Sequence, residues 1–545
     1  MLMLTFANIF EAYADELPAV TAIVQGDTEV TWAQFDDQAG RLASLFKANG
    51  IGFDSKIGMF MYNCPEYLTT QYAGFKLRAV PVNVNYRYLD DELLYLLDNA
   101  DCEAIVFHSS LGDRIARVRD RLPKLKLIIE VLDGPSANIS GALSWQQVQT
   151  DHQPVSRQVR ARDDVYMLYT GGTTGMPKGV MYSLGIFTEG FLAFYSTPMG
   201  RAPFTSVEEI VQTAKGMQAV GGQGVAMPCC PLMHGTGVWL GALLPHLMAG
   251  KVVLSESRSF DAHEMFQTVE KNAVSTLVIV GDAFARPMVQ ALRERASTGT
   301  PYDTSSVTTI ISSGAMFSAE TKQGIFEYMP TTMVMDVLGS SEGGMAQTIA
   351  TKDNISNTAK FGAMPNMKVF APDDTEVVPG SGVQGIVGVS GDGVPRGYYK
   401  DPGKSDKTFR EINGVRYSFP GDMATVEADG SVTLLGRGSN CINTAGEKVF
   451  PEEVEEAVKT HPAIADCLIF GIPDERFGQR VVGVASLASG VTSAPTSDDV
   501  VVFTKTKLSS FKVPRQIVFV DLTPRAPNGK ADYATARKLF EEDIS

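Results

Sequence analysis

The sequence predicts an α/β protein in which a large N-terminal domain of layered α/β sheets precedes a small α+β C-terminal domain. Three observations indicate this organisation. Apolar runs of strand length alternate with helix-like segments along most of the chain, a pattern typical of parallel α/β layers. The composition changes after Gly436. The chain has 545 residues, which is enough for two or more domains of typical size.

The expected strands and helices follow the hydrophobic pattern. Short apolar runs predict buried strands, and longer segments with a helical period predict the helices between them. In the first domain, strands are expected at residues 164–168, 251–254, 276–280, 309–311 and 333–335, and helices at residues 263–272 and 284–292. In the second domain, a proline in the first turn favours a helix at residues 451–458, and strands are expected at residues 467–470 and 480–484. Residues 372–382 and 489–498 are rich in turn formers and predict loops.

Composition and charge limit the class of protein. The net charge is −15, which argues against a general nucleic-acid binder but leaves room for a local positive pocket that binds a nucleotide. The six cysteines have no framework or zinc-site spacing, so reduced thiols are expected. The N-terminus lacks the basic start of a signal peptide, and no apolar run approaches the ~18 residues of a membrane span. We therefore expect a cytoplasmic protein, with peripheral membrane contact left open.

One short segment carries most of the functional information. Residues 169–179 read Tyr-Thr-Gly-Gly-Thr-Thr-Gly-Met-Pro-Lys-Gly, and we expect them to form a loop at the carboxyl end of a strand of the parallel α/β layers. Glycines let backbone N–H groups form a nest for an anion, and threonine hydroxyls and a lysine add donors and charge. The segment is not a P-loop, because Lys178 is followed by glycine rather than by Ser or Thr. It predicts a polyphosphate cradle made by Thr170, Gly171, Gly172, Thr173, Thr174, Gly175 and Lys178. An ordinary glycine-rich turn is the alternative.

This segment resembles the phosphate-binding signature of the adenylate-forming superfamily, which includes acyl-CoA synthetases, luciferases and the adenylation domains of peptide synthetases. Gly171 stands where that family usually has serine. Six further segments match the family in order and rough spacing, so that the resemblance extends from Tyr169 to Lys530. Residues 62–67 and 82–87 are similar to the family more weakly. The branch that fits best is that of the fatty-acyl-CoA synthetases.

The resemblance implies the nucleotide contacts. Gly314 and Ala315 would pass the adenine, and Glu342 would be a ligand of Mg²⁺ beside the phosphates. Asp422 would accept both ribose hydroxyls, with Arg437 nearby. Leu338 replaces the tyrosine that commonly stacks on adenine. The remaining implied ATP contacts come from the segment before Glu342: Asp336, Leu338, Gly339, Ser340 and Ser341.

The resemblance also implies a catalytic lysine, two domains joined by a hinge, and contacts to CoA. Lys530 would be the catalytic lysine, and His234 would lie beside the carboxylate pocket without acting as a general base. The domains would be residues 1–437, which bind ATP and the acid, and residues 438–545, a mobile cap with its hinge at Ser439. Gly446, Glu447 and Lys448 would line the path of the CoA pantetheine.

The predicted activity is an ATP-dependent ligation of a carboxylic acid to CoA through acyl-AMP, with release of pyrophosphate. Small residues and methionines near Met217, Trp239, residues 221–224 and residues 343–345 suggest a pocket for a fatty, branched, terpenoid or steroid side-chain acid, with an aryl acid next. An insertion is expected around residues 200–222. Other possible functions are loading of a carrier protein, a luciferase-type oxidation and a non-catalytic nucleotide-binding scaffold. The protein is expected to be a monomer or a homodimer.

Overall fold

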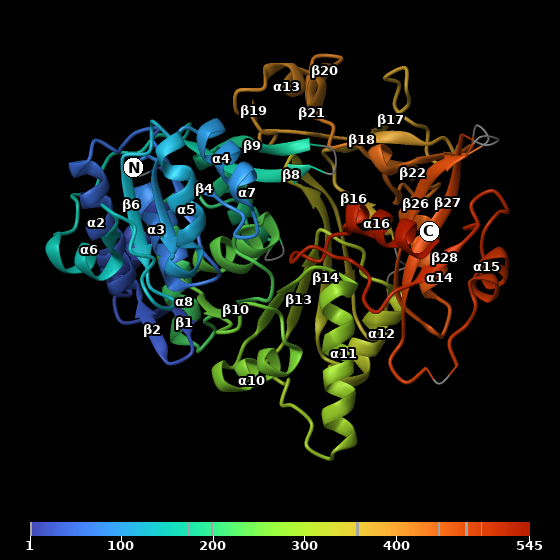
Figure 1. Cartoon of the computed structure of the whole chain (residues 1–545). Coiled ribbons are helices and arrows are strands. Elements are labelled where there is room, and N and C mark those ends of the chain that lie inside the picture. The colour runs from blue at the N-terminus through green and yellow to red at the C-terminus, as the bar shows by residue number, and fades with distance from the viewer. Residues whose placement is uncertain are drawn as a thin grey trace.

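The computed structural model of the chain describes residues 3–172, 175–197, 200–355, 359–444, 447–474, 478–491 and 493–544. It has a large N-terminal part, blue to light orange in Figure 1, and a smaller C-terminal part in darker orange and red. The two parts face each other across the N-terminal end of the long helix α11 (Asp282–Ser297). The predicted division into α/β layers followed by a small α+β unit is confirmed.

The largest sheet joins a parallel half to an antiparallel half. Parallel pairs connect β1, β11, β10, β12, β13 and β14, and the pairs from β14 onward are antiparallel. The spatial order is β2-β1-β11-β10-β12-β13-β14-β15-β16-β23-β22-β18-β21-β20, with β17 beside β18. Its strands are β1 (Thr21–Gln25), β2 (Thr28–Thr31), β10 (Val225–Pro228), β11 (Lys251–Leu254), β12 (Thr276–Ile279), β13 (Thr309–Ser313), β14 (Met333–Ser340), β15 (Gly343–Ala350), β16 (Lys360–Ala363), β17 (Met367–Phe370), β18 (Gly385–Ser390), β20 (Phe409–Ile412), β21 (Val415–Ser418), β22 (Asp422–Val426) and β23 (Val432–Arg437).

A second parallel sheet lies in the first part of the chain. Its order is β4-β3-β5-β6-β7, so the chain places β4 on one side of β3 and then β5 on the other. Its strands are β3 (Lys56–Phe60), β4 (Val80–Asn83), β5 (Cys102–His108), β6 (Leu127–Val131) and β7 (Leu143–Ser144). The helices of this region are α1 (Phe6–Glu16), α2 (Trp32–Ala48), α3 (Pro65–Lys76), α4 (Asp90–Asn99), α5 (Gly112–Val118) and α6 (Trp145–Asp151), with short 3₁₀ turns at Ser109–Leu111 and Arg119–Arg121.

The glycine-rich segment folds differently from the expectation. We expected a loop at the end of a parallel strand, but β8 (Val165–Gly172) continues through the first glycines and pairs antiparallel with β9 (Gly175–Ser183). Together with β19 (Gly397–Tyr398) these strands form a third sheet. The sequence pattern suggests turns, because glycine is a common turn former. In the hairpin, however, the absence of a side chain on Gly179 allows the two strands to pack closely. A Cβ atom on Gly179 would lie 2.6 Å from Met167 Sδ and 2.8 Å from the Tyr169 ring.

The remaining helices of the N-terminal part include α7 (Leu184–Ser196), α8 (Val207–Ala219), a π-helical segment at Thr236–Leu243, α9 (Leu244–His246), α10 (Ala262–Asn272), α12 (Ala319–Tyr328) and α13 (Pro402–Thr408). Residues 200–222, where an insertion is expected, include α8, which packs against α1. Among the described residues, no helix is both long enough and apolar enough to cross a bilayer. All six cysteines are free thiols.

The C-terminal part has its own sheet and core. The strands are β24 (Ile442–Thr444), β25 (Glu447–Val449), β26 (Ile464–Asp474), β27 (Gly478–Leu487) and β28 (Ile517–Phe519), and the helices are α14 (Pro451–Lys459), α15 (Ser497–Lys505) and α16 (Tyr533–Ile544). The chain leaves the largest sheet at Arg437 and enters this sheet at Ile442, through a 3₁₀ turn at Gly438–Asn440. The domain boundary after Arg437 remains a proposal, which this passage between two sheets supports.

Candidate functional site

Two asparagines hold the loop that carries His234. Asn83, at the end of β4, accepts a hydrogen bond from Tyr169 N (2.7 Å) and donates to the carbonyls of Tyr169 (2.8 Å) and Met233 (2.7 Å). Asn63 accepts from Leu232 N at 2.7 Å and donates to Cys230 O at 3.2 Å. The glycine-rich hairpin and the His234 loop are therefore fixed to each other through β4. These asparagines lie in the two segments with only a weak resemblance to the family, and their role was not predicted.

Glu342 and Lys178 meet around a tyrosine that sequence reasoning missed. Glu342 lies in the tight turn between β14 and β15. The Tyr398 hydroxyl donates to Glu342 Oε1 at 2.8 Å, and the Lys178 ammonium lies 5.0 Å from the centre of the Tyr398 ring. Burial, and then the neighbouring Lys404, lowers the pKa of Lys178. The run Gly-Tyr-Tyr-Lys around Tyr398 has no pattern that indicates nucleotide binding, so only the fold brings this tyrosine to the site.

Asp422 is a buried carboxylate with a free oxygen. It pairs with Arg437 across β22 and β23, and Arg437 Nε lies 3.7 Å from Asp422 Oδ1. Asp422 is 7% exposed, and its Oδ2 has no hydrogen-bond partner among the described residues. Burial raises the pKa of Asp422, and the charge of Arg437 opposes that rise. Since buried polar atoms are normally paired, this oxygen fits a ligand that brings a donor, such as the hydroxyls of a ribose.

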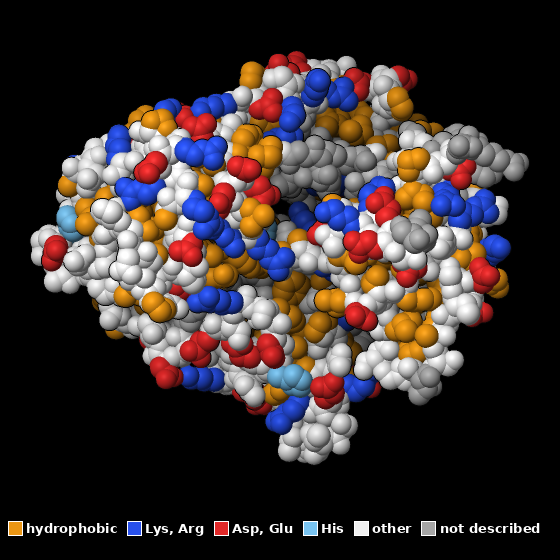
Figure 2. All heavy atoms as spheres, viewed as in Figure 1, with side chains coloured by type: hydrophobic (Ala, Val, Ile, Leu, Met, Phe, Trp, Pro, Cys, Tyr) orange, Lys and Arg blue, Asp and Glu red, His pale blue; other side chains and the backbone are white. Residues whose placement is uncertain are grey.

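Lys530 reaches the same place from the far end of the chain. A Cβ atom on Gly314, which follows β13, would lie 3.8 Å from Lys530 Cε. Burial and then the charge of Arg437 lower the pKa of Lys530, and Glu342 and Asp422 oppose that shift. Protein groups surround the ammonium, although the residue as a whole is exposed. Figure 2 shows a hollow between the two parts of the molecule, with Lys and Arg side chains at its edges and within it.

The loop that carries Lys530 rests on the start of α11. Gly529 has a φ of +73°, and a Cβ atom there would lie 2.9 Å from Ala283 Cβ and 3.2 Å from Val280 O. Arg525 braces the loop, because it donates to Gly529 O at 3.1 Å and forms an ion pair with Asp466 at 2.5 Å. A second contact between the two parts runs from Arg286 of α11 to the carbonyl of Ala465. In this arrangement the C-terminal part presents Lys530 to the cleft.

His234 is neutral. Its Nε2 is buried without a hydrogen-bond partner among the described residues. Burial, and then the nearby charge of Lys530, lowers the pKa of His234 to about 3. The imidazole therefore carries no charge at neutral pH, and its Nε2 is available to a polar group of a ligand. This agrees with a role in a pocket rather than in proton transfer.

An aromatic wall stands beside His234. Trp239, in the π-helical segment, donates from Nε1 to the Tyr166 hydroxyl at 2.8 Å, and its ring lies 5.7 Å from that of Tyr182 and 5.2 Å from that of Phe187. The Tyr182 hydroxyl donates to Ser341 O, which joins this wall to the Glu342 turn. A Cβ atom on Gly235 would lie 3.0 Å from the Trp239 ring, so the missing side chain lets this turn pack closely against the indole.

Other predicted residues lie apart from the cleft or at its edge. The Asp336 carboxylate accepts from Lys322 Nζ at 3.1 Å in the interior, where burial raises its pKa to about 6. Leu338 packs on the core around Met345, which is fully buried and so lines no open pocket. Ser340 Oγ accepts from Glu342 N at 3.1 Å. Ala315 packs on the core beneath α11, and Gly339 and Ser341 flank the Glu342 turn.

The predicted hinge and CoA contacts are only partly described. Thr173, Thr174 and Gly446 lie outside the described residues, as do the side chains of Ser439 and Lys448. The Ser439 backbone lies in the 3₁₀ turn between the two sheets, and Glu447 is exposed on β25. Gly171, Gly172 and Gly175 belong to the ends of β8 and β9.

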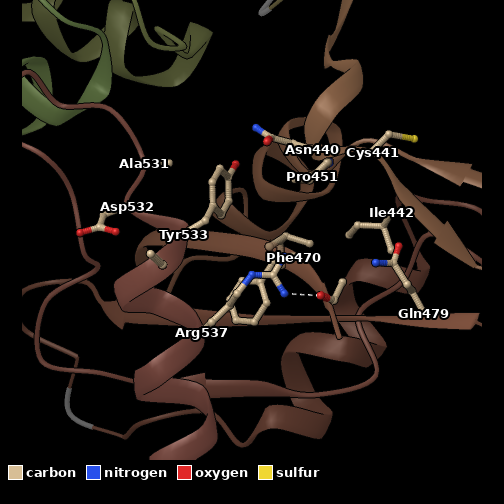
Figure 3. Close-up of a pocket in the computed structure, with 13 residues that line it drawn as sticks. Asn440, Cys441, Ile442, Pro451, Phe470, Gln479, Ala531, Asp532, Tyr533 and Arg537 are labelled. Carbon is tan, nitrogen blue, oxygen red and sulfur yellow. Dashed lines mark hydrogen bonds between the residues drawn. The ribbon is translucent and has the colours of Figure 1, made fainter. Parts of the chain in front are cut away.

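A cavity in the C-terminal part is separate from this group. It has a volume of about 450 Å³ and opens between Asn440 and Cys441 on one side and residues 531–534 on the other. Figure 3 shows Tyr533 and Arg537 rising from α16 along its wall, with Arg537 bonded to the carbonyl of Gly471. Among the described residues, none of those predicted for ATP binding lines it.

Comparison with known proteins identifies the family. The pattern described as "AMP-binding enzyme" matches residues 10–399, and the pattern described as "AMP-binding enzyme C-terminal domain" matches residues 453–530. The chain belongs to the family of AMP-binding enzymes, as its motifs predict. The two matched regions leave the passage around Arg437 between them.

Relatives of similar length match this protein along almost its whole sequence. It is 38% identical to the 3-oxocholest-4-en-26-oate–CoA ligase of Rhodococcus rhodochrous, over 98% of this chain and 95% of the relative. It is 37% identical to the medium/long-chain-fatty-acid–CoA/3-oxocholest-4-en-26-oate–CoA ligase of Mycolicibacterium smegmatis, over 99% of this chain and 97% of the relative. Among solved structures, the anthranilate CoA ligase AuaEII in complex with anthranoyl-AMP has the same fold, with a TM-score of 0.82 at 21% identity over 100% of this chain and 98% of that one.

Proposed function

We propose that this protein is an ATP-dependent acyl-CoA synthetase that activates a bulky apolar carboxylic acid as acyl-AMP, releases pyrophosphate and transfers the acyl group to the thiol of CoA. The observation that carries the proposal is the position of Lys530. This cation, from the end of the chain, lies in one cleft with Gly314, Glu342, Asp422 and Arg437. The names of the relatives agree with this activity.

The first half-reaction joins the acid to AMP. The carboxylate attacks the α-phosphorus of ATP, the bond from that phosphorus to the bridging oxygen breaks, and pyrophosphate leaves. Because negative charge accumulates around phosphorus, the protein acts mainly by positioning and by electrostatic stabilisation. Lys530 would bridge the acid and the α-phosphate. Asp422 would accept the ribose hydroxyls through its unpaired oxygen, and the β8–β9 hairpin with Lys178 would hold the outgoing phosphates.

A magnesium ion fits the same arrangement. Mg²⁺ prefers oxygen ligands and is usually held by one or two carboxylates together with substrate phosphates. Glu342 offers such a carboxylate beside the hairpin, with one oxygen oriented by Tyr398. When bound there, Mg²⁺ would supply positive charge to the departing phosphates.

The second half-reaction needs a different orientation of the C-terminal part over the cleft. The CoA thiol attacks the acyl carbonyl, and AMP leaves. The loop that carries Lys530 is docked on α11 beside the nucleotide site, in the arrangement suited to the first step. Rotation about the passage at Ser439 would withdraw this loop and bring Glu447 and Lys448 towards the acyl-AMP. This rotation and the CoA contacts are proposals that rest on the resemblance.

The wall of Trp239, Tyr182 and Phe187 supports a bulky apolar acid. Trp239 and Phe187 are only partly buried and offer aromatic surface near His234, so an apolar body can lie on this wall while its carboxylate points towards Lys530. The names of the relatives indicate a steroid side-chain acid or a medium- to long-chain fatty acid.

A panel of acids tests the proposal. Pyrophosphate release is measured with steroid side-chain, medium-chain, long-chain and aryl acids, with and without CoA. We expect turnover with an apolar acid and accumulation of its CoA thioester. Release of pyrophosphate without a CoA thioester, together with transfer to a carrier protein, would favour the carrier-loading alternative. Absence of acid-dependent ATP–pyrophosphate exchange with every acid would favour a non-catalytic scaffold.

A further inference from the structure

A glutamate of the C-terminal part has its carboxylate buried against a strand of the N-terminal part. Glu452 lies in the first turn of α14, which packs against β23 of the largest sheet. A Cβ atom on Gly436 of β23 would lie 2.6 Å from Glu452 Cδ, and Gly436 has a φ of +116°. Only glycine therefore suits this position, where a carboxylate of one part rests on the backbone of the other.

One oxygen of this carboxylate is unpaired. Glu452 Oε2 is buried, and none of the residues that the structure describes forms a hydrogen bond with it. Buried polar atoms are normally paired, and an unpaired buried charge weakens the arrangement that buries it. The cation on the same strand is already engaged, because Arg437 Nε lies 3.7 Å from Asp422 Oδ1.

The charges around Glu452 increase this cost. Burial raises the pKa of Glu452, and hydrogen bonds from its own backbone, the backbone of Arg437 and the Asn440 side chain oppose the rise. The charge of Asp422 raises this pKa further. Burial and then the charge of Glu452 raise the pKa of Glu455 to about 7. The charged or titratable groups that face Glu452 are Arg437 and Asp422 on the largest sheet and Glu455 and Tyr533 in the C-terminal part.

The neighbouring acidic residues have their partners inside the C-terminal part. The Tyr533 hydroxyl donates to Glu455 Oε1 at 2.9 Å. Glu453, the next residue of α14, forms an ion pair with Lys512 at 2.6 Å. These contacts move with the C-terminal part as one body. Glu452 differs from Glu453 because its surroundings change when α14 leaves β23.

We infer that Glu452 is a positioning residue that sets the balance between the two half-reactions. In the arrangement that places Lys530 in the cleft, the buried and ionised carboxylate weakens the contact between α14 and β23. Rotation about the passage at Ser439 separates α14 from β23 and returns this carboxylate to water. Glu452 thus keeps the docking weak enough for the C-terminal part to turn once acyl-AMP has formed. The inference rests on the proposed function, which requires that rotation.

Glu452→Gln tests this role, because an amide of nearly the same shape is buried without charge. We expect thioester formation from supplied acyl-AMP to fall about tenfold, since the docked arrangement becomes more stable, and acid-dependent ATP–pyrophosphate exchange to stay unchanged or to rise. Glu453→Gln is the matched control and should leave both rates within about twofold. An equal loss of both activities in Glu452→Gln, no change in either, or the same effect in Glu453→Gln would overturn the inference.

The pH profile gives a second readout that a purely structural role would not change. A glutamate has an ordinary pKa of 4.5, and the pKa of Glu452 is raised in the docked arrangement. Protonation of Glu452 therefore favours docking at pH values below 4.5, and this contribution is lost as the pH rises through the raised pKa. The ratio of exchange to thioester formation should rise more steeply in the wild type than in Glu452→Gln as the pH falls from about 8 towards about 5. Identical profiles would contradict the inference.

A measurement without turnover separates the role of Glu452 from the proposed function. In the docked arrangement Gly438 N, in the passage between the sheets, donates to Gly421 O at 2.9 Å. Hydrogen–deuterium exchange of residues 438–441 and of the first turn of α14 should be about tenfold slower in Glu452→Gln than in the wild type or in Glu453→Gln. This result would support the role of Glu452 even if no acid yields a thioester, in which case only the proposed function fails. Equal exchange in all three proteins would refute that role.

Discussion

Replacement of Asp422 by asparagine separates ligand binding from stability. Asp422 is buried, its Oδ2 has no partner among the described residues, and burial raises its pKa. The ordinary pKa of an aspartate is 3.8. A carboxylate whose pKa is raised in the folded state favours folding when it is protonated, and this contribution is lost as the pH rises above that ordinary pKa and through the raised one. At neutral pH the ionised group therefore weakens the fold, and Asp422→Asn should leave the melting temperature unchanged or raise it.

The same substitution should damage nucleotide binding. Asparagine keeps one acceptor oxygen but turns the other position into a donor, so one charge-assisted hydrogen bond to a ribose hydroxyl is lost. Such a bond contributes about 1.5–3 kcal/mol. At about 1.4 kcal/mol per factor of ten, the KM for ATP in acid-dependent ATP–pyrophosphate exchange should rise roughly 10- to 150-fold.

Asp336→Asn is the matched control. Asp336 is also 7% exposed and its pKa is also raised, to about 6, but its carboxylate already accepts a hydrogen bond from Lys322. Its replacement should leave the KM for ATP within about twofold, since no ligand bond is lost. If Asp422→Asn lowered the melting temperature and left the KM for ATP unchanged, Asp422 would be a structural group and the ribose assignment would be wrong.

Three further substitutions test the C-terminal part. Lys530→Ala should lower acid-dependent ATP–pyrophosphate exchange at least a hundredfold and spare thioester formation from supplied acyl-AMP; an equal loss in both assays would contradict its role. Gly529→Ala places a Cβ atom 2.9 Å from Ala283 Cβ at a φ of +73°, so it should slow the exchange about tenfold with little effect on the second step, and an unchanged exchange rate would show that docking on α11 is not needed. Ser439→Pro should stiffen the passage and impair thioester formation far more than exchange, and normal thioester formation in that variant would remove Ser439 as the hinge.

The fold was largely predictable, because hydrophobic runs at strand length report burial directly. The strand expected at residues 251–254 is β11, and those at 276–280 and 309–311 correspond to β12 and β13. The glycine-rich segment was the main error in the fold. Local composition cannot distinguish glycines that turn the chain from glycines that let Met167 and Tyr169 pack closely in a hairpin.

The site was predictable only through the resemblance. No periodicity places Lys530 beside Gly314 or brings Glu342 to Lys178, because these contacts depend on how whole sheets pack. Tyr398, Asn63 and Asn83 were missed for a related reason. Their polar groups bond to a distant side chain or to distant backbone atoms, and nothing in the neighbouring sequence indicates such partners. Asp336 was expected near ATP, but its side chain turns inward to Lys322, as the alternation of faces along a strand allows.

The passage between the two sheets limits how this enzyme can change state. Residues 438–441 connect β23 to β24 and span at most about 14 Å when extended, at ~3.5 Å per residue. The C-terminal part therefore cannot diffuse away, and the proposed rotation would be a unimolecular event whose rate is independent of protein concentration. Cleavage of the chain between Arg437 and Ile442 would turn that rotation into an encounter between two molecules. The effective concentration supplied by a short tether, on the order of millimolar, would be lost.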